Sequence, residues 1–225
     1  IYRTKSGKDL LHQLNDTSHW LMCSLIHKFG GKDKGEEATD EDVEKYLQEL
    51  RSSIPSDFKA KGDLIFIIGQ SHNDISSSEY LVSYHGISAS PAPYFDLEEE
   101  FTMQQKVKSL IQESRINAAH DVADGGLFVA LAEMGMPNNL GFDIVTDSEV
   151  REDAFLFGEG QGRVVVTVNE DQEDDFIGAM MDSGVSFTLL GHVTKGKLMI
   201  DDEHFGFINE AKNVFDNALG KHLEN

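Results

Sequence analysis

Residues 119–134 read Ala-His-Asp-Val-Ala-Asp-Gly-Gly-Leu-Phe-Val-Ala-Leu-Ala-Glu-Met, and this stretch decides the fold. Its second half has apolar residues at the i, i+3, i+4 and i+7 spacing of a helix with one buried face, and these are Leu127, Ala130, Leu131 and Met134. Asp124 is predicted to cap that helix, which would leave the amides of Gly125 and Gly126 without partners inside it. The sequence therefore predicts a helix that begins at a Gly-Gly pair, directly after two carboxylates.

The start of this helix has two interpretations. Glycine amides at a helix start admit close approach and attract anions, whereas Asp121 and Asp124 would repel a bare phosphate. Mg²⁺ reconciles these features, because it is typically held by one or two carboxylates together with phosphate oxygens. An aspartate-capped helix whose glycines allow tight packing explains the same residues without a ligand. Asp121 and Asp124 are therefore candidate metal ligands, and the purely structural interpretation stays open.

The composition narrows the class of protein. The chain has 225 residues, of which 40% are hydrophobic, enough for one large domain or two small ones. Its 40 acidic residues against 19 Lys and Arg give a net charge of −21, which does not favour nucleic acid or an anionic membrane as a partner. No apolar run reaches the length of a membrane span, and no signal peptide is visible. The single Cys23 fits a reducing cytoplasm and a buried thiol rather than a nucleophile.

Two parts are predicted along the chain. Residues 1–57 are expected to be a helical segment, either the tail of a preceding domain or an insertion, and residues 58–225 are expected to form the main domain. Buried strands are predicted at 64–68, 142–145, 163–168, 185–190 and 198–200, and apolar helix faces within 103–111, 127–134 and 176–181. Since helices alternate with strands, we expect an α/β or α+β layered fold. The chain begins with Ile1 rather than methionine, from which we expect it to be a piece of a longer protein.

Two further polar segments are candidates for binding. Residues 76–80 place hydroxyl groups and one carboxylate in a loop, although a capped turn is the better explanation of this segment taken alone. In residues 157–163 a glycine stands at every second position from 158 to 162, so the polar side chains of Glu159 and Gln161 are predicted to face a cleft. Glu159 and Gln161 could bind an amide, a ribose hydroxyl or a metal, and the structural alternative is an Arg–Glu pair that fixes the turn. Arg163 is predicted to anchor this loop by pairing with a carboxylate. No zinc-ligand spacing, Walker loop or dinucleotide fingerprint is present.

The ordered set of motifs resembles the C-terminal-type domain of the aminoimidazole ribonucleotide synthetase superfamily, and within it the phosphoribosylformylglycinamidine synthases. The matching segments are Gly62-Asp63, Ser76 to Tyr80, His85-Gly86, Pro93 with Asp96-Leu97, His120 to Leu127, Ala130 to Met134 and Phe157 to Arg163. They span residues 58–200, roughly two-thirds of the chain. Two departures stand out, because Ser76-Ser77 replaces the usual Gly-Gly and Ala123 stands where the family usually has serine.

The resemblance implies the fold, the reaction and the ligands. It implies an α+β domain with α/β/α layers around a mixed sheet, from a cytoplasmic, ATP-dependent C–N ligase (an amidotransferase) of purine biosynthesis. That enzyme converts formylglycinamide ribonucleotide, ATP and glutamine-derived ammonia to formylglycinamidine ribonucleotide, ADP and phosphate. Mg²⁺ and ATP or ADP are the implied cofactors, with Asp121 and Asp124 as metal ligands. The implied nucleotide or substrate contacts are Ser78, Glu79, His120, Gly125, Gly126, Glu159, Gln161 and Arg163. The implied partners are N-terminal-type synthetase domains and a glutaminase domain or subunit.

Residues 157–163 are similar to the version of this motif in the second half of the enzyme, where the bound nucleotide can be structural. No catalytic residue is expected within this chain, which by itself is expected to be inactive. One alternative is another superfamily member: aminoimidazole ribonucleotide synthetase, selenophosphate synthetase or a hydrogenase-maturation protein. The segment of Ser78-Glu79-Tyr80 with His85-Gly86 argues against it. The other alternative is a degenerate, purely structural domain, which Ser76, Ser77 and Ala123 favour.

Overall fold

The structure, a computed structural model, describes residues 53–223, so the helices expected within residues 9–50 lie outside the described part of the chain. The described residues form β1 (Leu64–Ile68), the π-helix η1 (Tyr80–Tyr84), α4 (Leu97–Gln112), β2 (Ala118–Asp121), α5 (Gly126–Gly135), β3 (Gly141–Ile144), α6 (Glu152–Phe157), β4 (Val164–Val168), the 3₁₀ turn η2 (Glu170–Gln172), α7 (Glu173–Met181), β5 (Phe187–Thr194), β6 (Lys197–Ile200), β7 (Glu203–Phe207) and α8 (Ile208–Leu223).

The strands form a seven-stranded sheet in the order β2-β4-β1-β5-β3-β6-β7. Neighbouring strands are antiparallel except β3 and β6, which run parallel, so the sheet is mixed. The hydrophobic strand β1 lies between β4 and β5, and the edge strand β2 brings residues 118–121 to one side of the sheet.

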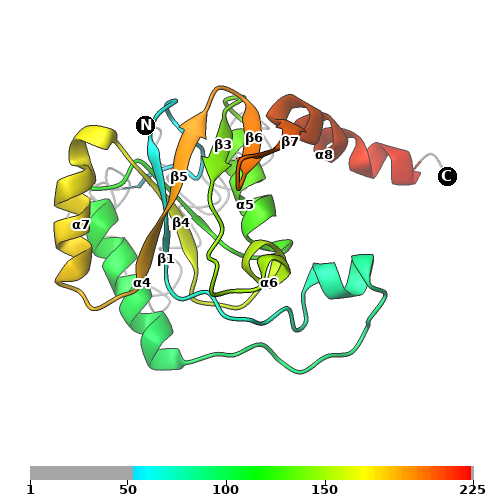
Figure 1. Ribbon diagram of the computed structural model, residues 1–225, viewed down its shortest axis with the longest axis horizontal. Coiled ribbons are helices and arrows are strands. Elements are labelled where there is room, and N and C mark those ends of the chain that lie inside the picture. The colour runs from blue at the N-terminus through cyan, green and yellow to red at the C-terminus, as the bar shows by residue number, and fades with distance from the viewer. Residues whose placement is uncertain (1–52, 224–225) are drawn as a thin grey trace, which may run out of the picture. The chain divides into compact units, whose positions relative to one another are not determined.

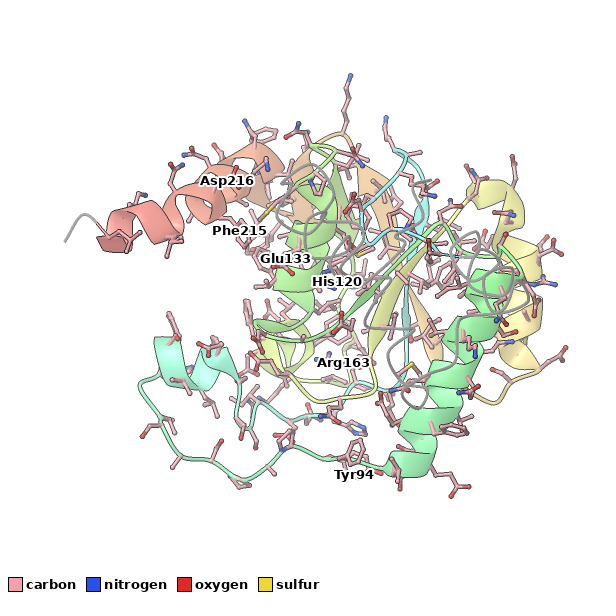
Figure 2. All side chains as sticks on the ribbon, turned by 180° about the vertical axis from the view of Figure 1, so that it is seen from behind. Tyr94, His120, Glu133, Arg163, Phe215 and Asp216 are labelled. Atoms are coloured by element: carbon pink, nitrogen blue, oxygen red, sulfur yellow. The ribbon has the colours of Figure 1, made fainter. Side chains whose placement is uncertain are left out.

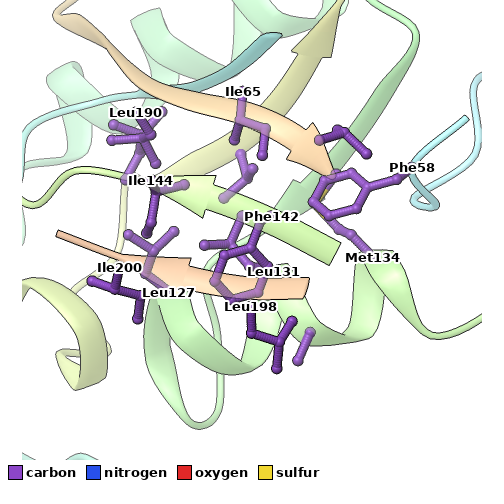
Figure 3. Packing of buried hydrophobic residues seen from close by; sticks show 14 of the residues in the cluster. Phe58, Ile65, Leu127, Leu131, Met134, Phe142, Ile144, Leu190, Leu198 and Ile200 are labelled. Atoms are coloured by element: carbon purple, nitrogen blue, oxygen red, sulfur yellow. The ribbon is translucent and has the colours of Figure 1, made fainter. Parts of the chain in front are cut away.

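The two faces of the sheet carry separate hydrophobic cores, and Figure 1 shows α4 and α7 on one face with α5 and α6 on the other. Alternate residues of β1 divide between them, as strand geometry requires. Ile65 and Ile67 pack with α5 and α6, whereas Phe66 and Ile68 pack with α4 and α7. Figure 3 shows the first core, where Leu127 and Leu131 of α5 meet Phe142 of β3. Each of these side chains stabilises the fold by about 1.5–3 kcal/mol when fully buried. The predicted α+β fold with α/β/α layers is thereby confirmed.

Most of the predicted elements are present. The strand at 64–68 and the buried faces of α4, α5 and α7 are confirmed, because Met103, Leu131 and Phe176 lie in the cores. The strand predicted at 185–190 is shifted, since β5 continues to Thr194 and pairs there with β3. Strands β2 and β7 and helices α6 and α8 were not predicted from the sequence. Of these, β2, α6 and β7 are short elements of four to six residues, which give little periodicity.

Two elements extend outward with exposed apolar side chains. Residues 77–96, named the arm here, project from the domain between β1 and α4 (Figure 1), and η1 within the arm has no buried residue. The arm and the start of α4 expose Val82, Tyr84, Ile87, Tyr94, Phe95, Leu97 and Phe101. Helix α8 exposes Val214, Phe215, Leu219 and Leu223, and Figure 2 shows Phe215 on it. Within residues 53–223 no helix is long and apolar enough to cross a membrane.

Candidate functional site

Helix α5 begins one residue later than predicted, and Asp124 does not cap it. The N-cap is Gly125, which has no side chain to bond the helix, and both Gly125 and Gly126 have left-handed backbone angles, with φ of +84° and +73°. This pair of angles turns the chain sharply from β2 into α5, a conformation that favours glycine. The prediction that Asp124 is the N-cap was therefore wrong, and its carboxylate makes no hydrogen bond within residues 53–223.

The two glycine amides are not open to a ligand, contrary to the prediction. The Gly126 amide donates to the carbonyl oxygen of Ala123 at 2.9 Å. A Cβ on Gly126 would lie 2.7 Å from both the carbonyl oxygen of Leu156 and the Cα of Phe157. The missing side chain at Gly126 thus allows α5 to pack against the end of α6, which is the structural interpretation of this glycine.

The Gly125 amide is bonded by a side chain of the chain itself. Glu159 Oε1 accepts a hydrogen bond from Gly125 N at 2.7 Å and a second one from Glu79 N at 2.8 Å. One carboxylate oxygen therefore joins the arm, the start of α5 and the turn after α6. We call this arrangement the Glu159 bridge. It brings together three of the motifs that the sequence singled out.

The loop around Ser78 is held by local hydrogen bonds. Ser78 is fully buried, its hydroxyl donates to Ile75 O at 2.7 Å, and it accepts from Leu81 N at 3.3 Å. Both hydrogen bonds of this hydroxyl are therefore made within the turn, whereas Ser78 was expected to contact a ligand. Ser77, which stands where the family has glycine, has a φ of +58°, and its amide donates to Ser90 Oγ at 2.6 Å. The chain thus keeps a glycine-like backbone at Ser77 and compensates with hydrogen bonds across the arm.

Asp74 closes the base of the arm, although no sequence motif singled it out. Its two carboxylate oxygens accept from Ser76 N at 2.8 Å and from Tyr94 N at 3.2 Å, which joins the two ends of the loop. Burial raises the pKa of Asp74, but the hydrogen bonds from Ser76 and Tyr94 outweigh it, so the pKa lies below 3.8. The polar run after the buried strand β1 was the available signal for this residue.

Arg163 anchors the turn after α6, but through carbonyl groups. Its guanidinium is 5% exposed and donates to the carbonyl oxygens of Phe155, at 3.1 Å, and of Gly158. The prediction that it pairs with a carboxylate was wrong. Burial lowers its pKa to about 10, and it still carries its charge at neutral pH. Because its donors face the backbone, Arg163 fixes the turn that presents Glu159.

Glu159 and Gln161 were predicted to face a cleft together, but only Gln161 lines the cavity near β1. Gln161 is exposed and lines a cavity of about 410 Å³, together with Gly69, Gln70, Tyr94 and Glu100. Glu159 does not line that cavity, since its carboxylate is engaged in the bridge. The wall formed by the start of α4 is acidic, with Asp96, Glu98, Glu99 and Glu100.

His120 joins the end of β2 to α5. Its Nδ1 lies 2.7 Å from the carbonyl oxygen of Asp121, which can only accept, so Nδ1 is assigned the proton. Its Nε2 faces Glu133 Oε2 at 3.4 Å, and Figure 2 shows these two side chains close together. The ring is thus oriented by β2 on one side and by α5 on the other.

The candidate metal ligands are two exposed carboxylates. The Asp121 side chain is 79% exposed, and Asp124 is also exposed. Within residues 53–223 no group of three or more His, Cys, Asp and Glu residues is arranged to hold a metal ion. One carboxylate at the end of β2 and one on the loop before α5 fit the donor set of Mg²⁺, which needs one or two protein carboxylates when phosphate oxygens complete its shell.

Together, the three layers, the mixed sheet and the loop that precedes α5 define a synthetase-type α+β domain. Residues 60–201 match the family model of the C-terminal domain of AIR synthase related proteins. The chain belongs to this family.

Relatives of known name are considerably longer than this chain. A phosphoribosylformylglycinamidine synthase subunit PurL from Moorella thermoacetica is 35% identical over 154 residues, which cover 68% of this chain and 21% of the relative. The PurL subunit of Rhodopseudomonas palustris is 37% identical over 179 residues, which cover 79% of this chain and 24% of the relative. The chain thus spans about a fifth to a quarter of these relatives.

A solved structure, T. maritima PurL complexed with FGAR, superposes with a TM-score of 0.61. The match covers 72% of this chain and 30% of that chain, at 16% sequence identity. At this identity the likeness establishes the fold alone.

Proposed function

We propose that the chain is a C-terminal-type domain from the second half of a phosphoribosylformylglycinamidine synthase, and that it forms one wall of a nucleotide and substrate cleft. The family match and the PurL relatives support this assignment. The observation that carries it is the convergence at Glu159, where the arm, the start of α5 directly after Asp124 and the turn after α6 meet. Three segments that are far apart in the sequence thereby lie in contact.

In the proposed reaction, ATP activates the amide oxygen of formylglycinamide ribonucleotide, and ammonia then displaces phosphate. Asp121 and Asp124 would hold Mg²⁺, which supplies positive charge to nucleotide phosphates that the acidic chain would otherwise repel. His120 is oriented beside these carboxylates, and Gln161 offers amide groups to a substrate in the cavity near β1. The catalytic groups would come from other domains, so we expect this chain alone to be inactive.

Partner domains are part of this proposal. The arm exposes apolar side chains, and residues 62–105 contain no Lys or Arg, so this surface suits a partner with an apolar face and a basic rim. N-terminal-type synthetase domains and a glutaminase domain or subunit are the partners that we propose, in the cytoplasm. The solved structure of PurLQS from Thermotoga maritima, which superposes on this chain with a TM-score of 0.53, is in keeping with such partners.

A purely structural domain is the second candidate, and one observation favours it. Both glycine amides at the α5 start are satisfied within the chain, and Ala123 provides no hydroxyl there. Calorimetric titration with Mg²⁺ and ADP separates the candidates. We expect binding by the chain that is lost in the double variant Asp121→Asn, Asp124→Asn and kept in the control Asp182→Asn. Absence of binding to the unchanged chain would support the structural role.

Catalysis is tested separately. We expect no ATP hydrolysis and no glutaminase activity from the purified chain, because no catalytic residue is proposed within it. Turnover above that of a heat-killed sample, and proportional to the amount of chain added, would contradict the proposed role as one part of a larger enzyme.

A further inference from the structure

The arm is not held in place by the hydrophobic core. None of the residues of η1 is buried, and Tyr84 is 76% exposed. A segment with so little apolar burial ordinarily opens at low cost in free energy. The contacts that fix its first residues must therefore be specific polar and aromatic ones.

Two such contacts come from the end of α6 and the turn that follows it. The Tyr80 ring stacks on Phe157, with 5.0 Å between ring centroids and 15° between planes. Two residues further on, Glu159 accepts the Glu79 amide at 2.8 Å. Hydrogen bonds to an ionised acceptor are about twice as strong as those between neutral groups. The arm is thus attached at two consecutive residues, one to the last residue of α6 and the other to Glu159 in the turn after it.

The turn itself is rigid, which makes it a suitable anchor. Arg163 holds it through the carbonyl oxygens of Phe155 and Gly158. A Cβ on Gly158 would lie 2.4 Å from Ala154 O and 2.6 Å from Asp74 O, so the base of the arm packs directly against the turn. Glu159 is therefore presented from a fixed backbone to both of its donors.

We propose that Glu159 is a positioning residue, whose carboxylate fixes the arm against the start of α5 and so sets the shape of the site. The bridge also occupies the Gly125 amide, the group that would otherwise attract an anion. A nucleotide phosphate would accordingly be held through a metal ion at Asp121 and Asp124, and not by this amide. That last consequence rests on the proposed function, whereas the bridge is a property of the chain itself.

Amide hydrogen exchange of the whole ¹⁵N-labelled chain tests the bridge. In Glu159→Ala we expect the amides of Glu79 and Gly125 to exchange about tenfold faster or more, since each loses a hydrogen bond to a charged group. Amides of β4 should keep their exchange rates. Glu159→Gln retains an acceptor oxygen at the same position and should restore most of the protection. Gln161→Ala, in the same turn, is the matched control and should leave both amides unchanged.

Separate outcomes would overturn the proposal. If Glu159→Ala changes only one of the two amides, or neither, the bridge does not position the arm. If the amides of Glu79 and Gly125 exchange as fast in Glu159→Gln as in Glu159→Ala, an acceptor oxygen at residue 159 is not what protects them. Should Glu159→Ala fail to fold, Glu159→Asp replaces it, because its shorter side chain cannot reach both donors, and the same two amides are compared. The exchange measurements need no nucleotide. They therefore test the bridge even if the chain does not bind Mg²⁺ and ADP.

A titration with inorganic phosphate tests the second part. We expect the Gly125 amide resonance to stay in place in the unchanged chain, because Glu159 already occupies that position. A shift of the Gly125 resonance that saturates with phosphate, accompanied by faster exchange at Glu79, would show that phosphate displaces Glu159 and would overturn this assignment.

Discussion

Asn117 donates its side-chain amide to the buried carboxylate of Asp63, with 3.4 Å between Nδ2 and Oδ2. Asp63 is only 3% exposed and directly precedes the central strand β1. Burial raises the pKa of Asp63 above 3.8, and the hydrogen bond from Asn117 offsets this only in part. The folded chain therefore keeps a carboxylate at a position that disfavours its charge.

Asp63→Asn is expected to raise the free energy of unfolding at pH 7. Because its pKa is higher in the folded state, Asp63 contributes most to stability below pH 3.8, and that contribution is lost as the pH rises through the folded pKa. Urea unfolding at several pH values measures the effect. The gain should be present at pH 7 and vanish at pH values below 3.8. The exposed Asp182→Asn is the control, and a gain of equal size there would refute this explanation.

Arg163→Met is expected to lower the free energy of unfolding by about 2–4 kcal/mol, because it leaves the buried carbonyl oxygens of Phe155 and Gly158 without donors. Urea unfolding measures this loss. The matched control is Arg151→Met, which removes an exposed ion pair with Asp153 at 2.7 Å and should have little effect. Similar losses in both variants would mean that the buried donors of Arg163 have no special role.

Gly126→Ala is expected to destabilise the chain by more than about 2 kcal/mol, because it combines a φ of +73° with a Cβ only 2.7 Å from Leu156 O. Thermal and urea unfolding provide the measurement. Gly178→Ala, within α7, is the control, since a Cβ there meets nothing within 4 Å. That change should stabilise the chain by about 0.5–1 kcal/mol. A loss of stability at Gly178 as well would point to a general intolerance of alanine.

Asp124→Ala is expected to leave the melting temperature unchanged, because Asp124 does not cap α5. Its removal should weaken the binding of Mn²⁺, used as a spectroscopic substitute for Mg²⁺, by about tenfold or more. Electron paramagnetic resonance of free Mn²⁺ measures binding, and calorimetry measures the melting temperature. A lower melting temperature with unchanged Mn²⁺ binding would restore the capping interpretation.

The sequence predicts the layers better than it predicts the site. Strand β1 and the apolar faces of α4, α5 and α7 follow from local periodicity, because each needs only its own residues to be recognised. The exposed stripe of α8, from Val214 to Leu223, has the same periodicity and could have been predicted in the same way.

The site depends on contacts between distant segments. The Glu159 bridge joins Glu159 to Glu79, which is 80 positions away in the sequence, and to Gly125, which is 34 positions away. No local pattern encodes such a pairing. The capping prediction for Asp124 used correct residue preferences, but the left-handed angles of Gly125 and Gly126 moved the helix start beyond its reach. Arg163 was correctly predicted as an anchor, and its partners are backbone oxygens that sequence patterns do not distinguish from carboxylates.

The position of β1 in the sheet has a consequence for the order in which the chain folds. Both neighbours of β1, namely β4 and β5, begin about one hundred residues or more after it. During synthesis β1 therefore leaves the ribosome without a pairing partner and stays so until residue 164 emerges. Long-range pairing of this kind slows folding and exposes apolar strands to other chains. The five consecutive apolar residues of β1 are thus a segment at risk of aggregation before β5 has been made.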